Sequence, residues 1–112
     1  IEVDKKRMES ARLELQSMGF SYNSLEDLFE CIAYNETKDF ILFLSSGANM
    51  NIKNRSNGNT PLHIASEEGK TEVVDILLKI NVDIKVKNSD GKSPIDIARE
   101  MGHMEIVDLF TK

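Results

Sequence analysis

A repeated octapeptide is the feature that most constrains this chain. The residues GNTPLHIA, from Gly58 to Ala65, return as GKSPIDIA from Gly91 to Ala98, and 91 minus 58 gives an offset of 33. The agreement continues downstream, where EEGKTEVVDIL aligns with EMGHMEIVDLF. A repeat of this length is typical of stacked supersecondary units, in which each copy buries its apolar face against its neighbours. We therefore expect a chain built from copies of one unit.

A weaker copy precedes these two and runs from Leu28 to Asn49. It aligns Cys31 with Ala65, and 65 minus 31 gives an offset of 34. The extra residue falls between Asn51 and Gly58, so the loop there is expected to be one residue longer than the next one. A chain of 112 residues has room for one domain with a single core.

Each position of the repeat has a local physical meaning. Thr60 is suited to a helix N-cap, and Pro61 to the first helical position. Ala65 is small, so a paired helix can approach it closely. Gly69 can adopt the left-handed conformation that ends a helix. The dipeptides Asn57-Gly58 and Asp90-Gly91, which stand between repeats, predict tight turns. Each copy is therefore expected to hold two short helices and a hairpin loop.

The motif TPLHIA at residues 60–65, together with the offset of 33, resembles the ankyrin repeat. The resemblance covers about residues 25–112 and implies an all-α fold, a solenoid of helix-turn-helix units joined by short β-hairpin loops. The divisions that it implies are an N-terminal helix and lead-in segment at 1–24, a divergent first repeat at 25–57, a second repeat at 58–90 and a C-terminal capping repeat at 91–112. The motif positions are Thr60, Pro61, Leu62, His63, Ala65, Gly69, Gly91, Pro94, Ala98 and Gly102.

The lead-in segment does not repeat. Four apolar side chains fall there at helical spacing, namely Met8, Ala11, Leu15 and Met18. They predict an amphipathic helix at about residues 4–18 that begins with Asp4 as its cap, ends at Gly19 and covers the open edge of the first repeat. The segment MGFSY at 18–22 also resembles the lead-in of some bacterial ankyrin proteins.

Further helix ends are predicted from single polar residues. Ser24 followed by Asp27 indicates a capping box at the start of the next helix. Asn35 and Asn81 occupy positions where the other copies have glycine, so both are expected to end helices in the left-handed conformation.

The sequence offers no residue set for catalysis or cofactor binding. His63 has no accompanying nucleophile, and the resemblance implies that this histidine bonds to backbone and to the threonine of its motif; His103 is given a structural role as well. The triplet Gly91-Lys92-Ser93 matches the end of a phosphate-binding loop, but Val86 stands where that loop needs glycine. Cys31 lies on an apolar face and is expected to be a buried, inert thiol. We predict a protein that is not an enzyme, with no catalytic residue, metal or cofactor.

Composition restricts the classes of partner that this chain is expected to bind. Fourteen basic and nineteen acidic residues give a net charge of −5, which disfavours nucleic acid. The apolar runs are too short to span a membrane, and the first residues are too polar for a signal peptide. We expect a cytoplasmic monomer that binds another protein, with no nucleic-acid binding and no membrane insertion. If the chain belongs to a longer bacterial protein, the alternative is that the protein is secreted as an effector.

The resemblance implies a binding face. Stacked ankyrin repeats form a concave face from their hairpin tips and first helices, with tips that are mostly basic here and helices that are mostly acidic. The partner-binding positions carried over are Tyr34, Lys53, Arg55, Asn57, Asn59, Glu67, Glu68, Lys87, Ser89, Asp90, Lys92, Glu100 and Met101. The expected function is protein–protein interaction. Two alternatives stay open, a dedicated inhibitor or immunity protein of an enzyme or toxin, and the recognition domain of a larger bacterial effector.

Overall fold

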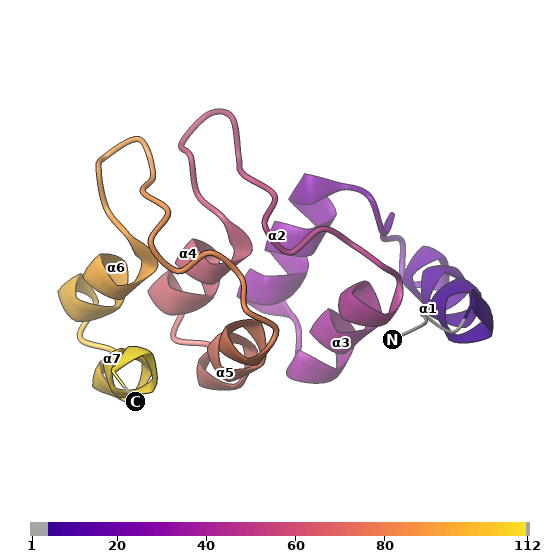
Figure 1. The fold of residues 1–112 in the computed structure, drawn as a ribbon. Coiled ribbons are helices and arrows are strands. Elements are labelled where there is room, and N and C mark those ends of the chain that lie inside the picture. The colour runs from indigo at the N-terminus through magenta and orange to yellow at the C-terminus, as the bar shows by residue number, and fades with distance from the viewer. Residues whose placement is uncertain (1–4, 112) are drawn as a thin grey trace. The chain divides into compact units, whose positions relative to one another are not determined.

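The computed structural model describes residues 5–111, and the chain divides into two compact units, residues 1–49 and 50–112. The helices are α1 (Lys5–Ser17), α2 (Leu25–Tyr34), α3 (Thr37–Ser45), α4 (Pro61–Glu67), α5 (Thr71–Lys79), α6 (Pro94–Glu100) and α7 (Met104–Phe110), as Figure 1 shows. No strand occurs within residues 5–111. The predicted all-α class is confirmed, whereas the predicted β-hairpins are loops with too few paired backbone groups to form a ladder.

In the first unit, α3 packs against both α1 and α2. The predicted apolar face of α1 buries Ala11 and Leu15, while Met8 is half-buried and Met18 lies exposed beyond the helix end. The helix ends at Gly19 as predicted, with φ at +87° and the Phe20 N–H donating to the Leu15 carbonyl. The predicted start lies outside the described residues, since Asp4 is not among them.

The caps of the first repeat differ from prediction. The Ser24 hydroxyl accepts from the Asp27 N–H at 3.2 Å, but the Asp27 carboxylate accepts from the Ser21 N–H at 2.7 Å instead of returning to Ser24. Half of the expected capping box is therefore present. The left-handed stop predicted at Asn35 is wrong, because this residue is extended at φ −104° and its side-chain amide donates to Asp39 at 3.1 Å.

The second unit holds two repeats of the same build. Helix α4 packs against α5 and α6, and α7 packs against α5 and α6. Thr60 and Ser93 cap the first helices of the two repeats, each followed by proline in the first turn. The left-handed helix ends predicted at Gly69, Asn81 and Gly102 are confirmed, with φ of +71°, +61° and +75°.

A small side chain is buried at the same position of the first helix in every repeat. Cys31, Ala65 and Ala98 occupy equivalent positions and are fully buried at 0% exposure. A larger side chain at such a position would force the two helices apart or strain its neighbours. All three repeats therefore keep a small buried residue at this position, although the sequence of the first repeat is divergent.

Candidate partner-binding site

Two hairpin loops stand side by side above α4 and α6 in the second unit (Figure 1). The first loop is closed by a hydrogen bond from the Asn54 N–H to the Asn59 carbonyl, and the second by one from the Asn88 N–H to the Lys92 carbonyl. The paired residues are five positions apart in the first loop and four in the second. The prediction of a longer first loop is confirmed, and Arg55 lies within it.

Backbone and amide groups join the two loops. The Ser89 N–H donates to the Asn57 carbonyl at 2.9 Å, and the Asn88 side-chain amide donates to the Asn59 side chain at 2.9 Å. Gly58 has φ +73°, and a Cβ there would lie 2.9 Å from the Ser89 nitrogen. Three predicted binding residues, Asn57, Asn59 and Ser89, therefore contribute groups that hold one loop against the next.

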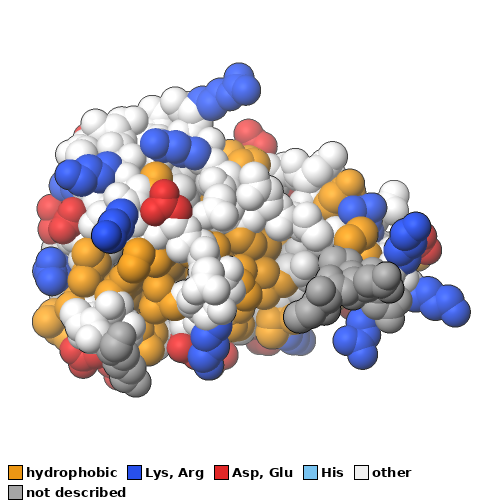
Figure 2. All heavy atoms as spheres, in the orientation of Figure 1, with side chains coloured by type: hydrophobic (Ala, Val, Ile, Leu, Met, Phe, Trp, Pro, Cys, Tyr) orange, Lys and Arg blue, Asp and Glu red, His pale blue; other side chains and the backbone are white. Residues whose placement is uncertain are grey.

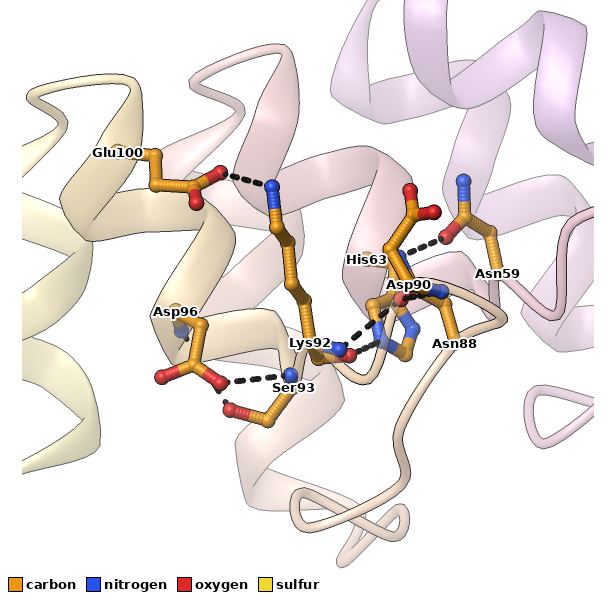
Figure 3. Close-up of polar contacts among 8 residues, drawn as sticks. All are labelled: Asn59, His63, Asn88, Asp90, Lys92, Ser93, Asp96 and Glu100. Atoms are coloured by element: carbon orange, nitrogen blue, oxygen red, sulfur yellow. Dashed lines mark hydrogen bonds and ion pairs between the residues drawn. The ribbon is translucent and has the colours of Figure 1, made fainter.

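His63 links the second repeat to the third (Figure 3). Its Nδ1 accepts from the Thr60 N–H at 3.1 Å, so the proton of the neutral ring lies on Nε2, which donates to the Lys92 carbonyl at 2.9 Å. The ring is fully buried. The structural role expected for His63 is confirmed, and the Lys92 backbone takes part in it.

Burial lowers the pKa of His63, because a charged imidazole loses its hydration there. The positive charge of Lys53 lowers this pKa further, against the hydrogen bonds to the backbone of Lys92 and Val86, which raise it. The ring is therefore held neutral, in the form that can accept at Nδ1 and donate at Nε2.

Asp96 occupies the position of His63 in the third repeat. Its carboxylate accepts from the Ser93 N–H at 2.9 Å and completes a local capping box (Figure 3). That hydrogen bond lowers the pKa of Asp96. A carboxylate has no N–H to donate, so Asp96 caps its own helix without the link that His63 makes to a neighbouring repeat.

His103 makes a second link between the same two repeats. Its Nε2 lies 3.0 Å from the Glu67 carbonyl, and the ring covers Gly69, where a Cβ would lie 2.9 Å from it. Sequence reasoning gave His103 a structural role but not this partner. The signal was Gly69 itself, because a glycine in the turn of the preceding repeat leaves room for an imidazole to stack on it.

The acidic positions expected along the first helices lie at the helix ends instead. Glu67 and Glu100 are the last residues of α4 and α6, and Glu68 and Met101 are the C-caps. The reason is length, since each helix begins at its proline and holds seven residues. The Glu100 carboxylate also pairs with the Lys92 ammonium at 2.9 Å, which raises the pKa of Lys92.

The remaining predicted contacts divide by unit. Among the predicted contacts in the second unit, six exposed charged residues form no ion pair with any described residue, namely Lys53, Arg55, Lys87, Asp90, Glu67 and Glu68. We call these six the hairpin–helix set. In the first unit, Tyr34 is the last residue of α2 and is 80% exposed.

The Cys31 thiol, possible metal ligands and the length of the helices were the remaining features of the described residues with a bearing on function. Burial, with the nearby Asp39 charge, raises the pKa of the Cys31 thiol to about 12, so the nucleophilic thiolate is scarce at neutral pH. Within residues 5–111 no three His, Cys, Asp or Glu side chains lie together as metal ligands. None of the helices over that same range is both long enough and apolar enough to cross a bilayer.

Comparison with known proteins decides the family. A family model described as ankyrin repeats in three copies matches residues 28–112. The chain belongs to the ankyrin repeat family. An ankyrin repeat protein of fowlpox virus (strain NVSL) is 42% identical over 53 residues, which make up 47% of this chain and 9% of that protein. The chain thus matches a small part of its viral relative, and the repeat boundaries given above stay predictions.

Asn88, in the second hairpin loop, was not among the residues predicted from the sequence. Asn88 donates to the Asn59 side chain, and its own side-chain oxygen accepts from the N–H groups of Asp90 and Lys92. The signal was present, because Asn54 holds the equivalent place at the start of the first loop and accepts from the Ser56 N–H in the same way. Asparagine at this position shapes the loop on which the charged tips are carried.

Proposed function

We propose that this ankyrin repeat chain binds another protein through the hairpin–helix set, with no chemistry of its own. Ankyrin repeats are generally protein–protein interaction modules, and the finer assignment to these residues is ours. The observation that carries it is the charge of the set, which forms no ion pair among the described residues: three cations and Asp90 at the loop tips, and two carboxylates at the ends of the first helices. Charges left open to solvent are available to a partner, whereas Lys92 and Glu100 already satisfy each other.

The set favours a partner with two zones of charge. Lys53, Arg55 and Lys87 would meet carboxylates of the partner, and Glu67 and Glu68 would meet basic groups. Charge complementarity of this kind speeds association and selects against wrong partners more than it adds affinity. Arg55 is the strongest candidate at the tips, because a guanidinium can hold a carboxylate through two parallel hydrogen bonds.

Tyr34 supports the proposal from the first unit. An exposed tyrosine offers a rigid apolar ring with a polar tip and loses little conformational entropy when a partner covers it. We infer that Tyr34 forms a contact of its own with the partner.

Affinity capture from the source organism tests the proposal. Wild-type protein and the variants Arg55→Ala, Lys53→Glu and Tyr34→Ala serve as bait, and retained proteins are quantified by mass spectrometry. We expect the wild type to retain a true partner and these three variants, the face variants, to retain less of it. For a hot-spot truncation the binding free energy is expected to weaken by about 2 kcal/mol, roughly thirtyfold in affinity. Circular dichroism confirms that each variant is folded.

The controls lie on second helices. Asp75 on α5 pairs with Lys79 at 2.9 Å, and Asp108 on α7 is exposed, so Asp75→Ala and Asp108→Ala change surface charge away from the set. Both controls are expected to keep the partner. Loss of binding in the controls with retention in the face variants would place the site on the second helices and overturn the proposal.

A further inference from the structure

Two neighbouring residues of the first hairpin loop, Asn57 and Gly58, carry groups that can react with each other. Asn57 is exposed and Gly58 is buried. In the 112 residues this is the only asparagine that precedes a glycine, whereas a residue with a side chain follows each of the other eight asparagines. Because glycine has no Cβ, its backbone nitrogen is the least hindered one for attack on the side chain of a preceding asparagine.

An asparagine side chain in this position can lose ammonia. A hydroxide ion takes the proton of the Gly58 N–H, and the nitrogen forms a bond to the side-chain carbonyl carbon of Asn57. The side-chain nitrogen takes a proton from water and leaves as ammonia, which regenerates the hydroxide and closes a succinimide ring. Water then opens the ring at the side-chain carbonyl to give aspartate, or at the main-chain carbonyl to give isoaspartate, in which the backbone contains an additional methylene group.

Two features of the loop favour the attack. The Asn57 side-chain oxygen accepts from the Asn59 N–H at 2.9 Å, so the side chain lies against the peptide unit that contains the attacking nitrogen. The same hydrogen bond stabilises the negative charge that develops on this oxygen, as donors do in an oxyanion hole. Lys53 and Arg55 are exposed beside it, and blue side chains stand out from a mostly white surface around the hairpin loops in Figure 2. Their positive charge favours the anionic form of the nitrogen.

The closed loop holds the nucleophile back. The Gly58 N–H donates to the Asn54 carbonyl at 2.7 Å, so its proton is not accessible to hydroxide. The second hairpin loop supports this closed form, because the Ser89 N–H donates to the Asn57 carbonyl and the Asn88 side-chain amide donates to a side chain of the first loop, both at 2.9 Å. The reaction therefore requires a local opening of the hairpin in which the Gly58 hydrogen bond breaks.

We propose that Asn57 deamidates spontaneously, at a rate that is set by local opening of the first hairpin loop. Because the second loop holds the first one closed, the rate depends on the contact between the two loops. Aspartate adds a negative charge to the loop that carries Arg55, and isoaspartate also displaces the carbonyl that accepts from Ser89. The modification needs only water and hydroxide, so it stands independently of partner binding.

Incubation of the folded chain in a mildly alkaline buffer, followed by proteolysis, chromatography and mass spectrometry, tests the proposal. A blocked peptide that spans residues 53–60 serves as the open reference. The folded chain is expected to convert Asn57 before any other asparagine, and at least about tenfold more slowly than the peptide. Hydrogen exchange of the Gly58 amide, measured by NMR under the same conditions, is expected to be slowed by the same factor, since both reactions need the same opening.

One variant loosens the contact between the loops, and one is its control. Asn88→Ala removes the side-chain amide that joins the loops and leaves the reacting residues in place, so it is expected to raise the rate at Asn57 at least about threefold. Asp75 lies on α5 and pairs with Lys79, so Asp75→Ala is expected to leave the rate unchanged. Circular dichroism checks that each variant is folded, and the comparison with Gly58 exchange in the wild type does not depend on either variant.

Three results would overturn the proposal. The first is a folded chain that reacts at Asn57 as fast as the peptide, which would show that the loop does not control the rate. The second is earlier conversion of another asparagine, or no product at Asn57 over many half-lives of the peptide, which would remove the site. The third is an unchanged rate in a folded Asn88→Ala protein, which would separate the reaction from the contact between the loops.

Discussion

The second and third repeats share a motif but differ in what each motif residue touches. His63 of the second repeat donates to the Lys92 carbonyl of the third, and a Cβ added at Gly58 would meet the Ser89 nitrogen in the second hairpin loop. Their equivalents are Asp96, which caps its own helix, and Gly91, which has no atom within 4 Å of an added Cβ. The same sequence position can therefore link two repeats in one copy and cap its own helix in the next copy.

The largest difference is expected between His63→Ala and Asp96→Ala. Removing the His63 ring leaves the Lys92 carbonyl without its donor and opens a cavity at a fully buried position. We expect a loss of about 3 kcal/mol in the free energy of unfolding, measured by urea denaturation. Asp96→Ala removes one side of a half-buried capping box and should cost clearly less. Equal losses would show that the His63 link does not hold the repeats together.

A second contrast lies between Gly58→Ala and Gly91→Ala. Both glycines have positive φ, +73° and +75°, so alanine is strained at either position by about 1 kcal/mol. At Gly58 the new Cβ also meets the Ser89 nitrogen at 2.9 Å. We expect a total loss of about 2 kcal/mol there in thermal unfolding. If the Gly91 variant proved the less stable of the two, the loop packing described above would be wrong.

The pH dependence of stability should separate the same two positions. The folded-state pKa of His63 is lowered from 6.5, so the unfolded chain binds the proton more readily. Its contribution is complete above pH 6.5 and declines as the pH falls below that value. The pKa of Asp96 is lowered from 3.8, so its contribution is present above pH 3.8 and is lost as the pH falls through the folded-state value.

Urea midpoints measured from pH 7 downward check these windows. His63→Gln should flatten the decline that begins near pH 6.5, and Asp96→Asn should flatten only the more acidic part of the curve. A His63→Gln curve parallel to that of the wild type throughout would remove His63 from the acid response.

The smallest effect is expected at Ser66 and its equivalent, Arg99. The Ser66 hydroxyl is buried and has no hydrogen-bond partner among residues 5–111, whereas Arg99 is exposed. Ser66→Ala removes a buried unsatisfied group from a helix and should raise the free energy of unfolding by about 0.5–1 kcal/mol. Arg99→Ala should change it by less than about 0.5 kcal/mol. A destabilised Ser66→Ala protein would reveal a partner for the hydroxyl.

The fold followed from sequence because its signals are local. Thr60, Pro61 and Gly69 act through their own backbone geometry, and each behaves as predicted. The extra loop residue was visible as a change of offset from 33 to 34. Asn35 shows the limit of this reasoning, since asparagine is compatible with several backbone conformations and a side-chain bond to Asp39 selected the extended one.

The candidate site was less predictable because exposure and pairing depend on distant residues. The family pattern selected Lys92 and Glu100 as contacts without showing that they pair with each other. It also gave no sign that Asn57, Asn59 and Ser89 join the loops.

The two imidazole links between neighbouring repeats bear on how this part of the chain folds. His63 and His103 both belong to contacts that exist only when the second and third repeats are docked. Neither repeat can open without breaking both links, one of which holds the buried His63 ring, so the pair is expected to unfold as one cooperative step rather than fray from one end. Backbone amides of α4 and α6 should then exchange their hydrogens at a common, slow rate.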